Sequence, residues 1–116
     1  MLIAFVMTFS VTYGQDIADV SQTDQYLTVR DASNNQISSK LRDNEELCGF
    51  SSNLIVVKKY EQYFIVYDQK FNQISSKLIN SGDKVKSVSG NNIIVKSGQY
   101  TITYDKDFNQ ISSRLD

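Results

Sequence analysis

The sequence predicts an all-β protein built from repeated antiparallel units of four short strands. Three observations support this fold class: a seven-residue motif recurs at a fixed interval, apolar and polar residues alternate within each unit, and turn residues recur too often for helices of ordinary length. The chain of 116 residues has the length of one ordinary domain.

The recurring motif is Asn-Gln-Ile-Ser-Ser-Lys-Leu, with Arg in place of Lys in its last copy. It begins at Asn35, Asn72 and Asn109, so both intervals are 37 residues (72 − 35 and 109 − 72). Two further sets of residues keep the same register: Tyr26, Tyr63 and Tyr100, and Asp31, Asp68 and Asp105. The repeat predicts one domain over residues 15–116, with units at about 6–41, 42–78 and 79–116.

The third unit shows the predicted strands most clearly, at residues 85–89, 93–96, 99–104 and 110–115. In the third of these, Tyr100, Ile102 and Tyr104 share one face, while the threonines between them share the other. The same alternation places Ile111, Ser113 and Leu115 on one side of the last strand. A helix is the alternative for the seven-residue motif, because its Ile and Leu stand four apart, but adjacent serines favour a strand.

Residues 1–14 form an apolar run without a charge, followed by polar residues. This pattern is typical of a signal peptide, whose removal would place the protein outside the cell or on the exterior of the cell envelope. The run is too short for a stable membrane span, which needs about 20 apolar residues. No Lys or Arg precedes it, and the repeat register leaves a second interpretation open, in which the run is the first buried strand.

Composition excludes several classes of function. A net charge of −1 gives no overall field to attract nucleic acid. The absence of His removes the usual proton shuttle and the commonest metal ligand, and the single cysteine, Cys48, allows no intramolecular disulfide. We therefore expect no enzymatic activity, no catalytic residue, no metal and no cofactor.

The pattern Val-x-x-Val-Ser-Gly-x-Asn-Ile-Ile-Val followed by Tyr-x-Ile-x-Tyr-Asp, at positions 85–105, resembles a blade of a β-propeller. The resemblance lies in repeat length and strand rhythm and names no subfamily, since the chain has no Trp. Propellers close with about 4 to 8 blades. Two to three blades imply an open or incomplete propeller, or a ring completed in a homo-oligomer.

The candidate ligand-binding residues are Tyr26, Tyr63 and Tyr100, which with Tyr67 and Tyr104 could form an aromatic ladder for sugars or a peptide. The alternative is that these tyrosines are ordinary strand residues, with a packed ring and a hydroxyl in water.

Four other features have ordinary structural interpretations. Asp105-x-Asp107-x-Asn109 is similar to part of a calcium loop, but Lys70 occupies the position of Asp107 in the preceding unit, which favours a turn. Cys48 is expected to be a small buried apolar residue. The pair Glu45-Glu46 is expected to be solvated on a turn, and the lysines at 58, 59, 84 and 86 to lie on a solvated strand face.

Together these observations predict a non-catalytic exported repeat module that binds a protein or a carbohydrate, since repeats present equivalent side chains at regular spacing. The alternative is a structural protein that assembles into a ring or filament by stacking of its blades.

Overall fold

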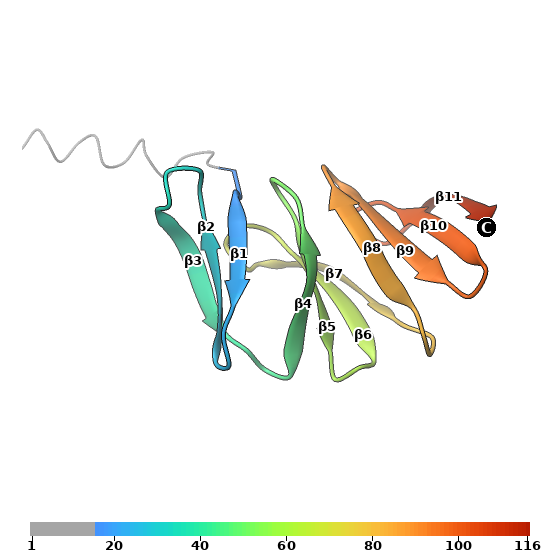
Figure 1. The fold of residues 1–116 in the computed structure, drawn as a ribbon, viewed down its shortest axis with the longest axis horizontal. Helices are drawn as coiled ribbons and strands as arrows, with labels where there is room; N and C mark the ends of the chain where they lie inside the picture. Colours follow the sequence, from blue (N-terminus) through green and yellow to red (C-terminus); the bar gives the residue numbers. More distant parts are fainter. Residues whose placement is uncertain (1–15) are drawn as a thin grey trace, which may run out of the picture.

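The computed structural model describes residues 16–116 as three antiparallel β-sheets. The sheets stand side by side in chain order (Figure 1). The described range has eleven strands and no helix, and the sheets do not close into a barrel. The predicted all-β class is confirmed, and the arrangement is compatible with an open, propeller-like stack.

Each sheet is a simple meander in which strands adjacent in sequence pair with one another. Sheet 1 contains β1 (Asp19–Gln22), β2 (Tyr26–Arg30) and β3 (Gln36–Leu41). Sheet 2 contains β4 (Glu45–Phe50), β5 (Ile55–Lys59), β6 (Tyr63–Tyr67) and β7 (Gln73–Leu78). Sheet 3 contains β8 (Lys84–Ser89), β9 (Asn92–Ser97), β10 (Tyr100–Tyr104) and β11 (Gln110–Leu115).

The seven-residue motif forms the last strand of every sheet, so the strand interpretation is confirmed and the helical alternative is wrong. Sheets 2 and 3 have the four strands predicted for a unit, whereas sheet 1 has three within the described range. The candidate signal peptide at residues 1–14 lies outside the described residues, and both interpretations of it stay predictions.

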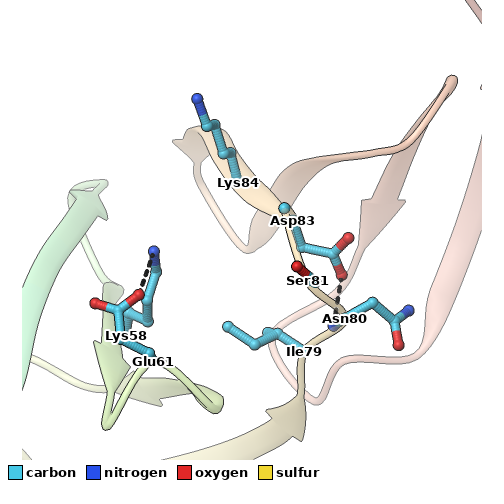
Figure 2. Close-up of a pocket in the computed structure, with 8 residues that line it drawn as sticks. Lys58, Glu61, Ile79, Asn80, Ser81, Asp83 and Lys84 are labelled. Carbon is cyan, nitrogen blue, oxygen red and sulfur yellow. Dashed lines mark hydrogen bonds and ion pairs between the residues drawn. The ribbon is translucent and has the colours of Figure 1, made fainter.

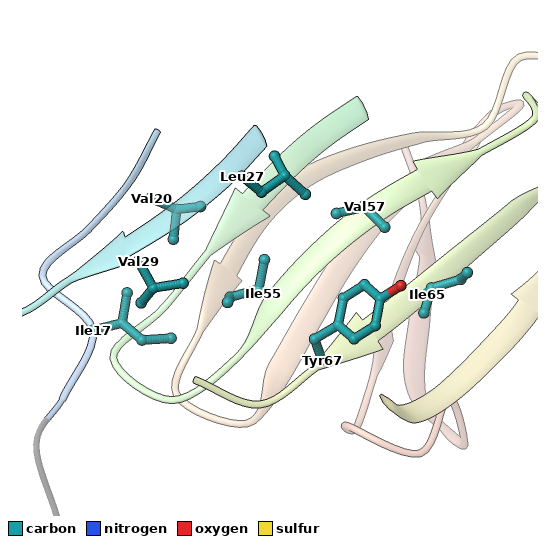
Figure 3. Close-up of a cluster of buried hydrophobic side chains, with 8 residues drawn as sticks. All are labelled: Ile17, Val20, Leu27, Val29, Ile55, Val57, Ile65 and Tyr67. Atoms are coloured by element: carbon teal, nitrogen blue, oxygen red, sulfur yellow. The ribbon is translucent and has the colours of Figure 1, made fainter. Parts of the chain in front are cut away.

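Two hydrophobic clusters hold the sheets together, one at each interface. The first joins sheet 1 to one face of sheet 2 (Figure 3) and consists of Ile17, Val20, Leu27, Val29, Ile55, Val57, Ile65 and Tyr67. The second joins the other face of sheet 2 to sheet 3 and consists of Leu54, Val56, Phe64, Val66, Ile93, Val95 and Tyr104. Strand residues alternate between faces, so β5 and β6 supply both clusters; β5 is apolar over its first three residues and β6 over its whole length.

One face assignment from the sequence is wrong. Alternation placed Ile111 and Leu115 on one side of the last strand, and both are exposed there. The same assignment fails in the two earlier copies of the motif, where Ile37 and Ile74 pack against the two clusters, whereas Leu41 and Leu78 are exposed. The cause is a β-bulge, which shifts the pairing of β3 with β2 and of β7 with β6 beside each isoleucine. An extra residue in one strand turns the isoleucine toward the next sheet.

The two outermost sheet faces are more polar than the faces between sheets. On sheet 1 the positions that alternate with Val20 and Val29 hold Asp19 and Arg30, which pair across β1 and β2. On sheet 3, Thr101 and Thr103 stand where sheet 2 has Phe64 and Val66. Asp116 accepts hydrogen bonds there from Lys96 and from the Thr101 hydroxyl.

The serines of the repeated motif connect consecutive sheets. The Ser38 hydroxyl donates to the Gln69 carbonyl, and the Ser75 hydroxyl donates to the Lys106 carbonyl, each at 2.5 Å. Both bonds link residues 31 apart. The first two copies of the motif therefore each connect their own sheet to a turn of the next sheet.

A buried carboxylate, Glu45, has partners on both sides of the first interface. Glu45 is 1% exposed and accepts hydrogen bonds from the Lys40 ammonium and from the Tyr67 hydroxyl. Lys40 also lies over the Tyr67 ring, 5.4 Å from its centroid. Burial and the hydrogen bond to Glu45 raise the pKa of Tyr67 above its ordinary value. The expectation of a solvated Glu45 is wrong, because the carboxylate has a cation and a hydroxyl as partners in the interface.

The second interface has a related arrangement. Lys77 lies over the Tyr104 ring, 5.4 Å from its centroid, as Lys40 lies over Tyr67. Asp83 is buried and accepts a hydrogen bond from the Ser97 hydroxyl at 2.7 Å. Burial and the Asp83 charge raise the pKa of Tyr104. The Lys of the repeated motif thus contributes to both interfaces.

The recurring aspartate forms the turn before the last strand of each sheet. In sheet 2 the Asp68 carboxylate accepts hydrogen bonds from the backbone N–H groups of Lys70 and Asn72 at 2.8 and 2.9 Å. Asp31 and Asp105 accept equivalent bonds in their own turns. The predicted turn role of Asp105 is confirmed, since its carboxylate receives backbone amides.

We expect Lys40→Ala to lower the free energy of unfolding by about 3 kcal/mol, because it leaves Glu45 buried with one partner fewer. Urea denaturation measures this change. The control is Arg114→Ala, which removes the cation at the same motif position in sheet 3, where the side chain is 71% exposed. That variant is expected to change the free energy by less than about 0.5 kcal/mol. Equal losses in the two variants would contradict the role of Lys40.

We expect Asp68→Ala to cost about 1 kcal/mol of stability, because two backbone amides lose their acceptor, and Asp68→Asn to cost less, because an amide oxygen can still accept. Partial burial raises the pKa of Asp68, but the hydrogen bonds from Asn72 and Lys70 hold it below its ordinary value of 3.8. The advantage of the wild type over Asp68→Asn is therefore present above this ordinary value and is lost as the pH falls through the lower folded-state pKa. Thermal denaturation between pH 2 and pH 7 checks this.

Candidate functional site

The three candidate tyrosines occupy the same position in each sheet. Tyr26, Tyr63 and Tyr100 are the first residues of β2, β6 and β10. Their exposed fractions are 45%, 39% and 51%, so each ring is largely accessible. The shared position follows from the repeat, because the register that starts each strand at a tyrosine is the same in all three units.

Each of these tyrosines is paired with an exposed leucine, the last residue of the neighbouring strand. The cross-strand pairs are Tyr26 with Leu41, Tyr63 with Leu78 and Tyr100 with Leu115. The leucines are between 61% and 66% exposed. We call these the Tyr–Leu pairs. Each sheet has one such exposed apolar pair, at the same end of the sheet.

The Tyr–Leu pairs account for most of the large apolar side chains on the surface. Within residues 16–116, eight large hydrophobic residues are exposed, and six of them are members of the pairs. The other two are Tyr60 and Ile111. Exposed apolar residues scattered singly need no explanation, whereas exposure repeated at one register does.

Tyr67 and Tyr104 do not belong to this surface. They are 6% and 8% exposed and pack in the clusters between sheets. Each ring meets a phenylalanine of its own turn edge to face, Phe71 for Tyr67 and Phe108 for Tyr104, with centroids 5.5 Å apart. The five-tyrosine ladder considered from the sequence is therefore divided into three surface residues and two core residues.

Polar grooves lie where one unit connects to the next. The larger has a volume of about 490 Å³. Lys58 and Glu61 lie on one side of it and the connection from β7 to β8 lies on the other (Figure 2). Lys58 pairs with Glu61 at 3.5 Å, and the Asp83 carboxylate accepts a hydrogen bond from the Asn80 N–H at 3.2 Å.

A second groove, of about 350 Å³, occupies the corresponding place between sheets 1 and 2. It is lined by Asp24, which stands 37 residues before Glu61, and by the connection Arg42–Asn44. Arg42 donates hydrogen bonds to the carbonyls of Thr23 and Glu45, at 2.7 and 2.9 Å. None of the six residues of the Tyr–Leu pairs lines either groove.

Cys48 is partly buried and packs against the second cluster. It occupies the bulge that shifts the register between β4 and β5. Burial is the main cause that raises the pKa of its thiol to about 11, although the Lys58 charge lowers it. The side chain thus has the character of a small apolar residue, as the sequence predicted, with a thiol that ionises poorly.

Several charged residues of the described range form ion pairs, and none of its acidic residues belongs to a metal-binding cluster. No three Cys, Asp or Glu residues within 16–116 gather closely enough to hold a metal ion. The lysine pair at the end of β5 is engaged, Lys58 with Glu61 and Lys59 with Asp43. Nor does this part of the chain contain a helix long and apolar enough to cross a membrane.

Sequence reasoning missed the leucine of each Tyr–Leu pair. Leu41, Leu78 and Leu115 end the most obvious motif in the chain, yet alternation grouped the leucine of this motif with its isoleucine. The usable signal was the equal distance between tyrosine and leucine in all three units, which is 15 residues (41 − 26, 78 − 63 and 115 − 100). A fixed separation across a tight turn indicates cross-strand partners.

Comparison with known proteins adds no family to this description. A scan of the sequence against protein-family models finds no match, and a search of curated proteins finds no significant similarity.

We expect Cys48 to react slowly with iodoacetamide. At pH 8 a thiol with a pKa of about 11 has roughly one hundredth of the thiolate of a thiol at the ordinary value of 9.0, so alkylation should be about a hundredfold slower than in the unfolded chain. Mass spectrometry of the native protein and of the protein in urea measures the two rates. Equal rates would show that the thiol is not desolvated.

Proposed function

We propose that this protein is a non-catalytic, exported repeat module, related in architecture to β-propellers, that binds a protein partner through its three Tyr–Leu pairs. The observation that carries the proposal is the repetition of an exposed tyrosine and leucine at one register in every sheet. Tyrosine is enriched at protein interfaces, where it combines a large apolar ring with a polar hydroxyl.

The form of this surface favours a protein over a small ligand. Small-molecule sites are concave and largely apolar, whereas the grooves of this protein are lined mainly by polar residues and contain none of the Tyr–Leu residues. Beside each tyrosine stands a leucine, which offers an apolar contact and no hydrogen bond to a sugar hydroxyl. A protein that presents apolar side chains to several sheets at once fits this pattern.

The spacing of the pairs sets a minimum size for the partner segment. Packed sheets lie about 10 Å apart, and an extended chain advances about 3.3 Å per residue. Contact with two neighbouring pairs therefore requires an extended segment of about four residues or more, and contact with all three requires about seven or more. Simultaneous contacts raise the overall affinity far above that of one pair.

Self-assembly by stacking of sheet faces is less well supported. A further sheet stacked on sheet 1 would meet Asp19 and Arg30, where sheet 2 presents Ile55 and Tyr67 to its neighbour. Asp19 and Arg30 stand opposite each other, but removing both charges from water costs free energy that their mutual attraction does not fully offset. The outer faces therefore offer a weaker drive to assemble than the faces between sheets.

The test uses twelve-residue peptides selected on phage against the wild-type protein, with chitin, cellulose and mannan as carbohydrate probes. Tyr63→Thr, Tyr26→Thr/Tyr63→Thr and the triple variant at positions 26, 63 and 100 retain strand propensity while removing the rings. We expect each substitution to weaken peptide binding about tenfold, since an interfacial tyrosine contributes more than 1 kcal/mol. Isothermal titration calorimetry measures the affinities.

The matched control is Ile111→Thr, which removes an exposed apolar side chain that belongs to no Tyr–Leu pair. It should leave the affinity unchanged, and all variants should keep the melting temperature of the wild type. Peptide affinities that do not depend on the tyrosines would overturn the proposed surface. Binding to one of the polysaccharides, lost in the triple variant, would overturn the assignment of a protein partner.

A further inference from the structure

In the part of the chain that the structure describes, the edge of β1 that faces away from β2 has no paired strand. In sheets 2 and 3 the second strand has the first strand beside it, β4 beside β5 and β8 beside β9. β1 holds the position of β5 and β9, since it pairs with β2 as they pair with β6 and β10. Within residues 16–116, however, β1 pairs with β2 alone.

The backbone of β1 offers hydrogen-bonding groups at this edge. The Thr23 N–H donates to the Tyr26 carbonyl at the hairpin end. Because hydrogen-bonded and non-hydrogen-bonded pairs alternate in antiparallel strands, Asp19 and Ser21 direct their backbone groups toward β2. Val20 and Gln22 therefore direct theirs to the other side, and unpaired groups of this kind form a template for another strand.

An apolar surface of β4 lies next to this edge. Leu47 and Phe50 of β4 are partly buried against the first cluster, in which Val20 of β1 also packs. Gln22 fixes the approach of the two strands, since its side-chain oxygen accepts a hydrogen bond from the Leu47 N–H at 2.6 Å. This apolar surface is continuous with the interface between sheets 1 and 2.

The interface between sheets 2 and 3 shows what covers the equivalent apolar surface of β8. Val85 and Val88 of β8 correspond to Leu47 and Phe50, and β4 lies over them. A methyl group added to Gly49 would lie 3.1 Å from Cγ2 of Val88, so the two inner strands approach closely. The strand that fits beside β1 therefore needs a small residue over the apolar side chains of β4.

We propose that β1 is a docking edge for an extended segment of a partner protein, which adds to sheet 1 as its fourth, innermost strand. This inference rests on the proposed export, which includes removal of residues 1–14 and so leaves a partner as the source of this strand. The segment is about six residues long, the length of β4 and β8, and carries a small side chain facing Leu47 and Phe50. This inference is independent of the Tyr–Leu surface, because main-chain hydrogen bonds supply the affinity.

The test uses the full chain and a synthetic peptide with the sequence of residues 82–91, which contains β8, an inner strand of this protein. Amide hydrogen exchange followed by nuclear magnetic resonance reports on β1. We expect the peptide to slow exchange at the Val20 and Gln22 amides at least tenfold, and to leave Asp19 and Ser21, which already face β2, unchanged. A peptide of the same composition in scrambled order is the control.

Two N-methylated peptides distinguish strand addition from apolar adhesion. In one peptide the methyl groups occupy every second backbone nitrogen of the strand, and in the other they occupy the alternate nitrogens. Only one set of amides faces β1, so one peptide should lose binding at least tenfold and the other should retain it. Equal binding of the two peptides would overturn the proposal.

Two further results would overturn it. Val20 and Gln22 amides that are already protected in the free protein would show that another part of the same chain or a second copy occupies the edge, and light scattering would separate these cases. No change in exchange at saturating peptide would show that the edge accepts no strand. The triple tyrosine variant should bind the peptide as the wild type does, so failure of the Tyr–Leu surface and failure of the docking edge are distinguishable.

Discussion

The fold depends on the burial of both faces of the middle sheet. A single four-stranded sheet has no core of its own, and only contact with a neighbour removes its apolar side chains from water. Sheet 2 therefore has central strands with buried apolar residues on both faces, whereas sheets 1 and 3 are apolar on one face. The polar contacts of each interface, a serine to a carbonyl and a lysine over a tyrosine, fix how the sheets meet.

This dependence explains which parts of the structure the sequence could predict. The strands and the aspartate turns follow from local chemistry, because alternation, turn residues and the hydrogen bonds of Asp68 all lie within a few residues. The burial of Glu45 could not be predicted in this way, because its hydroxyl partner, Tyr67, lies 22 residues away in sequence. The faces of Ile37 and Leu41 were also missed, because a bulge interrupts the alternation between them.

The sequence predicted the repeated position of the candidate tyrosines, but not which tyrosines are exposed. Tyr63 and Tyr67 alternate onto the same face of β6, and nothing in their local sequence distinguishes them. Their different exposure, 39% against 6%, arises because sheet 1 covers one end of the strand and leaves the other in water. Identifying the surface therefore required the relative position of two sheets, which single-sequence patterns do not contain.

The constant sequence separation of the serine contacts has an evolutionary consequence. Both link residues 31 apart, across one junction only, so each unit interacts mainly with its immediate neighbours. A duplication or deletion of 37 residues within the chain would add or remove one junction and leave the others as they are. The gene could thus vary the number of sheets in whole steps, and with it the length of the surface, without a new core.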